Sequence, residues 1–477
     1  MSTNTHLAAT LAALLGPQGW LSGADANAYS RDWLDRYGAT PLGVARPAST
    51  EQVAAVVAAC HAAGVPVTPQ GGNTGLCGGA VLEQPGGVIL SLSRMTKIAR
   101  PDPAAASIEV EAGVVLAALH ETLAEDGLIF PMHLGAEGSA QIGGLIATNA
   151  GGSHALRYGM MQDLVLGLEV VLPDGQIWNG LRAVQKDNAG YQLRRLFCGA
   201  EGTLGVVTRA VLKLYPAPRI RATALLALPD VPSLLAFGKR LRADAGEFIS
   251  GLEFFCDLGL DMALRHVHGL TYPLTERAPW YLLVEMTAGS PLVPLDALFE
   301  ATLTAGLETG EVLDGVLAVN ETQRAALWRL REEQPEGQRL EGPQLKHDVS
   351  VPPGLLDRFI AQACELCEHM LPGVRVNPFG HLGDGNTHFN LSPPLNAPGF
   401  GDLAPELGRE IGALASALGG SFAAEHGLGR AKVSLADALR ATPERALMAA
   451  IKQAIDPAQL MNPGAVLHTP GTNFAND

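Results

Sequence analysis

The sequence predicts an α+β fold of more than one packed unit, and three observations lead to this prediction. Residues 45–215 alternate short apolar runs with amphipathic helical patterns and glycine-rich loops. At 477 residues, the chain exceeds the size of one ordinary domain. No G-x-G-x-x-G motif follows a first strand, which disfavours the long βαβ succession of a Rossmann domain.

The first half of the chain contains one strong helix signal and several strand signals. The helix Glu51–Gly64 follows two candidate capping residues, Ser49 and Thr50. We expect strands at Val65–Thr68, Gly87–Leu92, Ser107–Glu111, Leu164–Leu172 and Gly205–Leu214. The turn Pro173-Asp174-Gly175 predicts a β-hairpin that joins Leu164–Leu172 to Gln176–Trp178.

The proline-containing stretch Tyr215–Arg219 marks a boundary between two parts of the chain. Beyond it, strand candidates are separated by helical patterns, at Thr223–Leu228, Trp280–Thr287 and Gly315–Val319. This order predicts an antiparallel sheet covered by helices on one side. Further helices are expected at Leu355–Leu371, at Asp402–Leu418 and up to Asp456, and Cys364 and Cys367 of the first are expected to pack in the interior.

Composition excludes several classes of function. The net charge of -15 leaves no basic face to neutralise phosphates, so we expect no nucleic-acid partner. No apolar run approaches the ~20 residues of a transmembrane helix, and Met1–Trp20 has no targeting signature, so a cytoplasmic protein is expected. The six scattered cysteines fit reduced thiols better than a disulfide framework.

Three glycine-rich loops are the strongest sign of a ligand site. The first, Pro69–Gly79, directly follows a strand, the second spans residues 134–152, and the third is Gly199–Val206. Successive small residues let backbone N–H groups converge on an anion, which suits a pyrophosphate. For each loop alone, a flexible surface loop is the alternative.

Together the loops resemble the FAD-binding domain of the vanillyl-alcohol oxidase superfamily, in its branch of D-lactate and D-2-hydroxyglutarate dehydrogenases. The resemblance covers nearly the whole chain. It implies a vanillyl-alcohol-oxidase-type FAD-binding domain at residues 1–218 and a substrate or cap domain at 219–420. It also implies a C-terminal segment at 421–477 that returns to the flavin.

The same resemblance implies which residues line the FAD. They are Pro69, Gly71, Gly72, Asn73, Thr74, Gly75, Gly135, Ser139, Gly143, Gly144, Asn149, Gly152 and Val206, with Asn462 close to the isoalloxazine. Some relatives attach the flavin through a histidine in the first loop, where this chain offers only Asn73 and Thr74. We therefore expect FAD to be bound without a covalent link.

The stretch Pro378–Asn390 carries two histidines around a Gly-Asp-Gly turn. Two short strands, Val374–Val376 and Thr387–Leu391, are expected beside it, and His381 and His388 can then bind one cation. Glu425, in a second glycine-bounded loop, can supply a third ligand. Two histidines and a carboxylate with an open position suit catalytic zinc, and also Mn, Co or Ni; ordinary turn histidines are the alternative.

In the resembled family, His381, His388 and Glu425 fall on metal ligands and His426 falls on the acid–base residue. Asn386, in the same stretch as the histidines, is a candidate substrate-binding residue. A 2-hydroxy acid can chelate such a cation, which makes its hydroxyl more acidic. His426 can accept the hydroxyl proton while the C2 hydride passes to flavin N5. The alternative for His426 is a hydrogen-bonding role beside the site.

Two cations are candidates for a second substrate carboxylate. Relatives that act on D-2-hydroxyglutarate hold it with an arginine and a lysine, which Arg331 and Lys346 match, whereas Pro335 replaces a family Ser or Thr. Arg331 is expected on a helix and Lys346 on the strand Gln344–Val349 that follows. Solvated surface charges are the alternative for both.

The leading expectation is FAD-dependent oxidation of a D-2-hydroxy dicarboxylate, D-2-hydroxyglutarate or D-malate. A D-lactate or glycolate dehydrogenase is the nearest alternative, and an inactive FAD-binding subunit of a larger oxidase is less favoured because the histidines and Glu425 are present. An electron-transfer flavoprotein, a quinone and oxygen all remain open as the electron acceptor. The oligomeric state also stays open, a homodimer included.

Overall fold

The computed structural model describes residues 3–469, which form two compact units. Unit 1 consists of residues 3–152, 158–216 and 425–469, and unit 2 of residues 153–157 and 217–424. The sequence placed its boundaries after residues 218 and 420. Residues 153–157 therefore belong to unit 2, although they follow a glycine-rich loop of unit 1 directly.

The first sheet of unit 1 has the order β1-β2-β4-β3. Its strands are β1 (Trp20–Leu21), β2 (Gly43–Ala45), β3 (Val67–Gln70) and β4 (Val88–Ser91). β2 and β3 run parallel to β4, and β1 pairs antiparallel with β2. Helices α1 (Thr3–Leu15) and α2 (Thr50–Ala63) pack their apolar residues into the same core as the strands, and the 3-10 helix η1 (Gly23–Tyr29) joins β1 to β2.

Helix α2 confirms the capping signals of the sequence. The Ser49 hydroxyl accepts a hydrogen bond from the Gln52 N–H at 3.3 Å and caps the amino end. Gly64, with φ of +65°, ends the helix in the left-handed conformation that glycine adopts without strain. The chain then enters β3, from which the first glycine-rich loop departs.

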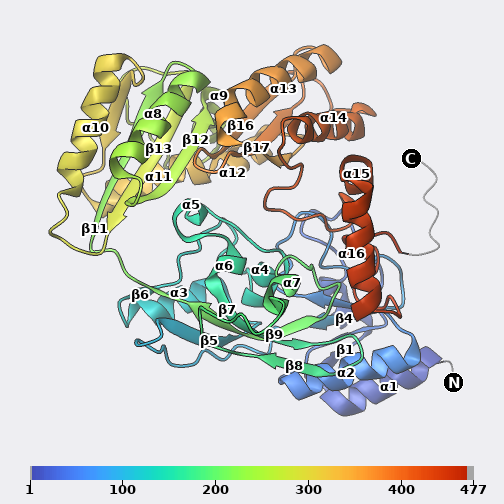
Figure 1. Ribbon diagram of the computed structural model, residues 1–477. Helices are drawn as coiled ribbons and strands as arrows, with labels where there is room; N and C mark the ends of the chain where they lie inside the picture. The colour runs from blue at the N-terminus through green and yellow to red at the C-terminus, as the bar shows by residue number, and fades with distance from the viewer. Residues whose placement is uncertain (1–2, 470–477) are drawn as a thin grey trace. The chain divides into compact units, whose positions relative to one another are not determined.

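The second sheet of unit 1 is antiparallel, with the order β5-β9-β7-β8 (Figure 1). Its strands are β5 (Ser107–Glu111), β7 (Val165–Val171), β8 (Ile177–Gly180) and β9 (Val206–Lys213). The hairpin predicted at Pro173-Asp174-Gly175 joins β7 to β8, and the Asp174 carboxylate accepts the Gln176 N–H there at 2.9 Å. The remaining elements are the ribbon β6 (Leu128–Ile129) with β10 (Tyr215–Pro216) and the helices α3 (Leu116–Ala124), α4 (Ile142–Ala147), α6 (Met161–Leu164), α7 (Leu193–Phe197), α15 (Val433–Leu439) and α16 (Thr442–Ile455).

The end of the described chain returns to the first sheet. The Asn462 N–H donates to the Val67 carbonyl at 2.8 Å, and the Val67 N–H donates to the Leu460 carbonyl at 2.9 Å. Met461 thereby forms a parallel bridge with Val67 at the start of β3. The segment 460–462 thus lies beside the strand that leads into the first glycine-rich loop.

Unit 2 is built on a seven-stranded antiparallel sheet with the order β14-β11-β13-β12-β16-β17-β15. Its strands are β11 (Ile220–Leu228), β12 (Ile249–Cys256), β13 (Trp280–Ala288), β14 (Asp314–Leu317), β15 (Asp348–Ser350), β16 (Arg375–His381) and β17 (Asn386–Ser392). Its helices are α5 (Ala155–Tyr158, whose last residue belongs to unit 1), α8 (Val231–Ala245), α9 (Asp257–His266), α10 (Leu295–Thr309), α11 (Glu321–Glu332), α12 (Gln334–Glu341), η2 (Pro353–Leu355), α13 (Leu356–Met370) and α14 (Leu403–Ala417).

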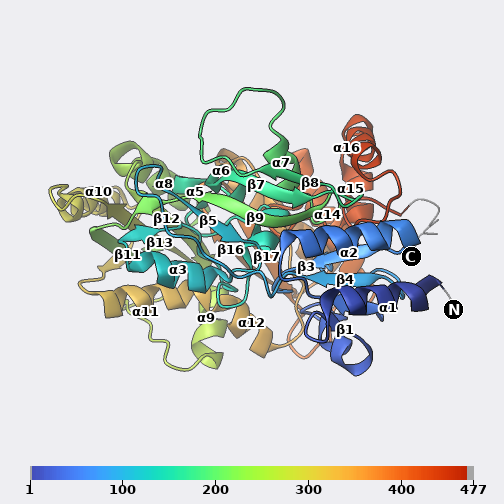
Figure 2. The same cartoon turned by 90° about the horizontal axis from the view of Figure 1, so that it is seen from below.

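Helices cover both faces of this sheet, so the expectation of a single covered face was wrong. Residues of α8, α10, α13 and α14 pack with one face, and residues of α9 and α11 with the other. Figure 2 shows α8 and α10 on one side of β11–β13 and α9 and α11 on the opposite side. The strands β12 and β13 have side chains to bury on both faces of the sheet. Every residue of β12, and every residue of β13 after Trp280, is buried. On α13, Cys364 and Cys367 are free thiols that pack against this core, as expected.

Candidate active site

A cavity in unit 1 is lined by all three glycine-rich loops. Nine of the residues that the sequence assigned to the flavin line it, and these are Pro69, Gly71, Gly72, Asn73, Thr74, Gly75, Gly143, Gly144 and Val206. His426 lines the same cavity. Small residues and backbone therefore form most of this surface, as a ligand that needs close backbone approach requires.

Gly72 is the tightest of the lining glycines at which the cavity wall has no room for a side chain. A Cβ added there would lie 2.0 Å from the Ser139 carbonyl oxygen, which joins the first loop to the second. The next residue, Asn73, has φ of +53°, and its side-chain amide donates to the Arg31 carbonyl at 2.8 Å. The Asn73 Oδ1 and Gln141 Oε1 atoms are buried and have no hydrogen-bond partner within residues 3–469. Two lining acceptors are thus left for a ligand to satisfy.

The other five flavin assignments do not line this cavity. Ser139 lies behind Gly72, Gly135 has open space where a side chain would be, and the Asn149 side chain accepts the Gln162 N–H at 2.9 Å. Gly152 donates its N–H to Glu425 Oε1 at 3.1 Å. These residues shape the loops in the structure, and their contact with a flavin stays a prediction.

Asn462 joins the three parts of unit 1 that meet at the cavity. Its amide nitrogen donates to the Gly79 carbonyl at 2.8 Å and to the Glu201 carbonyl at 2.7 Å. Its oxygen accepts from Thr68 and from Arg430. Because the buried amide is used in this way, Asn462 holds the first loop, the third loop and the C-terminal segment together.

Glu201 holds the loop that carries His426. One carboxylate oxygen accepts the Leu428 N–H at 2.9 Å and the other accepts the Gly429 N–H at 2.8 Å. Burial raises the pKa of Glu201, although these two hydrogen bonds act to lower it. The residue lines the cavity and has φ of +50°. Glu201 therefore fixes the backbone directly after His426 at the cavity wall.

Unit 2 places the two candidate metal-binding histidines on neighbouring strands. β16 extends to His381, well beyond the strand expected at Val374–Val376, and pairs with β17 so that His381 is opposite Asn386. The Gly-Asp-Gly turn closes the hairpin, with Gly385 at φ of +79°. The His381 and His388 rings lie 5.8 Å apart between centroids. The turn prediction is confirmed, and the antiparallel register explains how the histidines meet.

A chain of buried charges orients His381. Its Nδ1 atom lies 2.6 Å from Glu253 Oε1 on β12, and Glu253 Oε2 lies 2.9 Å from the Arg331 guanidinium on α11. Burial acts to raise the pKa of Glu253, but His381 and Arg331 lower it below its usual range. Since an ionised carboxylate only accepts, the Nδ1 atom of His381 carries the hydrogen, and Nε2 is the ring atom that can bind a cation.

A second buried carboxylate lies beside His388. Asp348, on β15, is 3.7 Å from His388 Nδ1 and accepts a hydrogen bond from the Asn386 amide at 2.9 Å. The Asn386 amide also donates to the Val349 carbonyl at 3.0 Å. Its oxygen is buried and has no hydrogen-bond partner in the described chain. Asn386 is thus fixed in place with one acceptor unused.

The two cations predicted for substrate differ in their surroundings. Arg331 is buried, paired with Glu253, and its guanidinium lies 4.7 Å from the Phe379 ring centroid. Lys346 is exposed and precedes β15, which begins only at Asp348. The strand predicted at Gln344–Val349 is therefore shorter than expected, although Leu345 forms an isolated bridge to Leu391.

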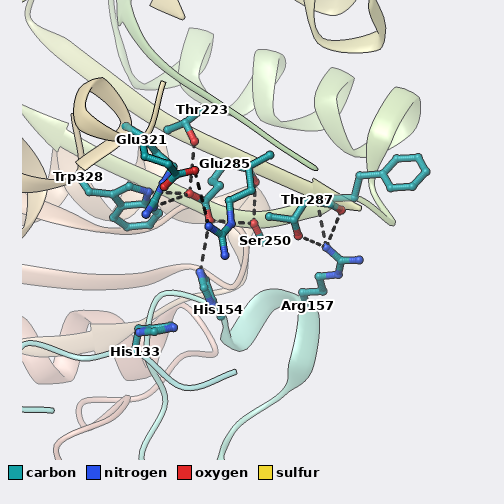
Figure 3. A network of polar contacts seen from close by, with 12 residues as sticks. His133, His154, Arg157, Thr223, Ser250, Glu285, Thr287, Glu321 and Trp328 are labelled. Carbon is teal, nitrogen blue, oxygen red and sulfur yellow. Dashed lines mark hydrogen bonds and ion pairs between the residues drawn. The ribbon is translucent and has the colours of Figure 1, made fainter. Parts of the chain in front are cut away.

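Glu285, on β13, is the centre of a second buried network in unit 2 (Figure 3). It accepts hydrogen bonds from Trp328 at 2.9 Å and from Arg324 at 3.3 Å, both on α11. His154 Nε2 lies 3.7 Å from its other oxygen, and Arg157 donates to the Thr287 carbonyl at 2.9 Å. These contacts hold residues 153–157 against unit 2. One face of α11 therefore points its polar groups at carboxylates of the sheet.

Comparisons with known proteins agree with these two regions. A family model described as "FAD binding domain" matches residues 41–180, and one described as "FAD linked oxidases, C-terminal domain" matches residues 217–466. The chain belongs to the FAD-linked oxidase family. It is an FAD-dependent oxidoreductase, and the predicted vanillyl-alcohol-oxidase-type fold is confirmed by the structural comparisons below.

Relatives with a curated name resemble this FAD-linked oxidase over most of its length. It is 39% identical to a D-2-hydroxyglutarate dehydrogenase of Xanthomonas citri, over 94% of this chain and 93% of that one. It is 34% identical to a D-2-hydroxyglutarate dehydrogenase of Stutzerimonas stutzeri, over 97% and 99%. The mitochondrial D-2-hydroxyglutarate dehydrogenase of Bos taurus is 36% identical, over 92% and 79%.

Solved structures share the fold. p-Cresol methylhydroxylase superposes with a TM-score of 0.74 at 18% identity, covering 98% of this chain and 97% of that one. Alkyldihydroxyacetonephosphate synthase gives a TM-score of 0.72 at 17% identity, covering 96% and 86%. Within residues 3–469, no helix is long and apolar enough to cross a membrane.

The sequence did not reveal the buried carboxylates of this FAD-linked oxidase that hold the candidate site residues in position. Glu201 lies within the third glycine-rich loop, but the sequence pattern assigned it no role of its own, and it assigned none to Glu253, Glu285 or Asp348. A signal was present, because Glu253 and Glu285 each interrupt a long apolar strand. A buried charge of this kind requires a partner, but the sequence does not name the partner.

Proposed function

We propose that this FAD-dependent enzyme oxidises a D-2-hydroxy acid to the 2-keto acid, and that the substrate is a dicarboxylate. D-2-hydroxyglutarate is the first candidate and D-malate a close competitor. The observation that carries the proposal is the pair His381 and His388, oriented beside buried carboxylates, in a chain with a separate flavin cavity. The printed names of the curated relatives support the same substrate class.

The cavity of unit 1 suits FAD held without a covalent link. Its glycine walls let a pyrophosphate approach backbone N–H groups, and the unpaired acceptors on Asn73 and Gln141 suit hydrogen-bond donors of the ligand. Bound there, FAD would supply the acceptor for the hydride that leaves substrate C2. Gly72 and Gly143 would let the cofactor approach the backbone, and Thr74 offers a hydroxyl in the first loop.

His381 and His388 would hold a divalent cation, zinc first, with manganese or cobalt as alternatives. Glu425 is the proposed third ligand. It directly follows Ala424, whose N–H donates to the Asp348 carbonyl at 3.3 Å. Asp348 lies on β15, which pairs with the strand β17 that carries His388. Such a cation would act as a Lewis acid and lower the pKa of the substrate hydroxyl.

His426 is the proposed base, and its imidazole nitrogen would take the hydroxyl proton. It lines the cavity proposed for the flavin, and Glu201 fixes the backbone that follows it. Asn386 is proposed to bind substrate, since its buried oxygen has no partner within residues 3–469. For the electrons, an electron-transfer flavoprotein or a quinone is the proposed acceptor.

Arg331 and Lys346 are proposed to hold the distal carboxylate of the substrate. One observation favours the monocarboxylate alternative, D-lactate or glycolate, because Arg331 already pairs with Glu253. A paired arginine can still donate from its remaining N–H groups, and Arg331 Nε has no hydrogen-bond partner among the described residues. The two substrate classes are therefore distinguished by measurement of rates.

A substrate screen with an artificial acceptor dye tests the proposal. We expect the highest kcat/KM for D-2-hydroxyglutarate, then D-malate, and much lower values for D-lactate and glycolate. A preference for D-lactate over both diacids would refute the dicarboxylate proposal. Acid precipitation should release yellow flavin, and a washed pellet that stays fluorescent would contradict non-covalent binding.

A further inference from the structure

Unit 1 contains a second group of histidine and carboxylate side chains, to which the proposed reaction gives no role. His120 lies on α3, and His133 and Glu137 lie on the segment that follows β6. One ligand atom from each residue lies within 4.8 Å of the others. Two histidines and one carboxylate form a donor set that suits zinc.

The distances are close to those that one ion requires. Glu137 Oε2 lies 3.2 Å from His133 Nδ1 and 3.9 Å from His120 Nδ1. Two tetrahedral ligands at about 2.0–2.1 Å from zinc are about 3.3 Å apart. Small rotations of side chains would therefore close the group around a cation, without a change in the backbone.

His120 is already oriented as a metal ligand. Its Nε2 atom lies 3.1 Å from the Phe130 carbonyl oxygen. A carbonyl only accepts, so Nε2 carries the hydrogen and the lone pair is on Nδ1, the atom nearer to Glu137. Burial and the neighbouring His133 lower the pKa of His120, and the hydrogen bond from His133 lowers the pKa of Glu137. The ring nitrogen of His120 that faces Glu137 is thus the one that can bind a cation.

The backbone that carries the three side chains is fixed. The Leu116 N–H at the start of α3 donates to the Ala140 carbonyl at 2.9 Å, and the Ala117 N–H donates to the Glu137 carbonyl at 3.1 Å. The turn after β6 is therefore attached to the helix that carries His120. Because these elements are already ordered, binding of an ion would lose little conformational entropy.

We propose that His120, His133 and Glu137 form a zinc site that is separate from the proposed catalytic cation and fastens α3 to the segment 133–139. On binding, zinc would replace the hydrogen between His133 and Glu137, and that proton would leave to solvent. Water would complete the coordination. The fastened segment includes Ser139, whose carbonyl lies against Gly72, so the ion would stiffen one support of the cavity wall.

Zinc stoichiometry of the full-length, FAD-loaded protein tests this site. After removal of metal with a chelator and dialysis, zinc is titrated against a competing chromophoric chelator. Glu137→Gln and His120→Ala should each bind one zinc per chain fewer than wild type, or bind it at least tenfold more weakly. His6→Ala, which removes an exposed histidine on α1, should match wild type.

The catalytic proposal and this one can fail separately. In His388→Ala, zinc should still bind and raise Tm, whereas in His388→Ala/Glu137→Gln it should do neither. If His388→Ala loses no zinc while Glu137→Gln loses one, the second site stands and the catalytic cation is refuted. If Glu137→Gln and His120→Ala, with normal flavin content, bind zinc as wild type does, the second site is refuted.

Discussion

The cavity of unit 1 that we propose for flavin and the histidine cluster of unit 2 depend on opposite features of their residues. The cavity wall requires residues without a side chain, since there is no room for a Cβ at Gly72. The histidine cluster depends on charges that compensate one another, in the buried sequence Arg331, Glu253, His381. The first region is therefore sensitive to added volume, and the second to a charge left without its partner.

The largest expected effect comes from added volume in the cavity. Gly72→Ala places a methyl group 2.0 Å from the Ser139 carbonyl, so the first and second loops must separate. We expect loss of bound flavin and of all activity, measured as flavin absorbance after desalting. Gly138→Ala is the matched control, because a Cβ there meets nothing within 4 Å, and it should keep its flavin. Normal flavin content in Gly72→Ala would contradict this account of the cavity.

Removal of the proposed cation should abolish turnover while flavin stays bound, because the two regions use different residues. We expect a chelator to inactivate the enzyme and zinc, cobalt or manganese to restore it. His388→Ala should retain flavin and be inactive. Full activity of a preparation shown to be free of metal by elemental analysis would rule the cation out of the mechanism.

His426 is the next largest expected effect. His426→Asn should keep flavin and metal and lower kcat by roughly 10²–10⁴-fold, the usual contribution of general acid–base catalysis. Single-turnover reduction of the flavin, followed by absorbance, isolates the step concerned. A loss below threefold would assign the proton to another group.

The difference between the two regions also explains what the sequence could predict. Glycine-rich loops and a hairpin turn are local patterns, so the cavity residues from Pro69 to Gly75 and the turn before Asn386 were predicted. The partners of buried charges are set by strand register across the sheet. Glu253 meets His381 because β12 pairs with β16, and no local pattern reports that pairing.

The same limit applies to Arg331. Its position on a helix was predicted, but its partner lies on β12, far away in the sequence. The coverage of both sheet faces was missed for a related reason, since the helices of the second face come from separate stretches. Residues 153–157 show it again, because His154, Leu156 and Arg157 all contact residues of unit 2 that lie far away in the sequence.

Substrate specificity offers a smaller effect that separates two roles of Arg331. If Arg331 and Lys346 hold the distal carboxylate, Lys346→Ala should lower kcat/KM for the diacids by roughly 10- to 150-fold and for D-lactate little. Arg331→Ala should lower it further for diacids, because a guanidinium can bind a carboxylate through two bonds. Rates with both substrates are measured for each variant.

Arg331→Ala also leaves Glu253 buried without its cation, so a second variant is required. Arg331→Ala/Glu253→Gln removes both charges and should recover stability. If the ratio of kcat/KM for diacids to kcat/KM for D-lactate is still lower in the double variant than in wild type, Arg331 binds substrate. If Arg331→Ala affects D-lactate and the diacids equally, its role is to orient Glu253 and His381.

The smallest expected effect on rate, and a clear one on stability, is at Glu285. Burial acts to raise the pKa of this carboxyl, but His154, Trp328 and Arg324 lower it from its ordinary 4.5 to about 2 (Figure 3). A lowered folded-state pKa stabilises the fold at pH values above the ordinary one, and the stabilisation is lost as pH falls from about 4.5 to about 2. At 1.36 kcal/mol per pKa unit, the contribution at neutral pH is on the order of 3 kcal/mol. Glu285→Gln should therefore be less stable than wild type at pH 7 in urea unfolding, and the two curves should converge in acid. A difference that is equally large at pH 3 would mean that Glu285 acts through packing rather than through its charge.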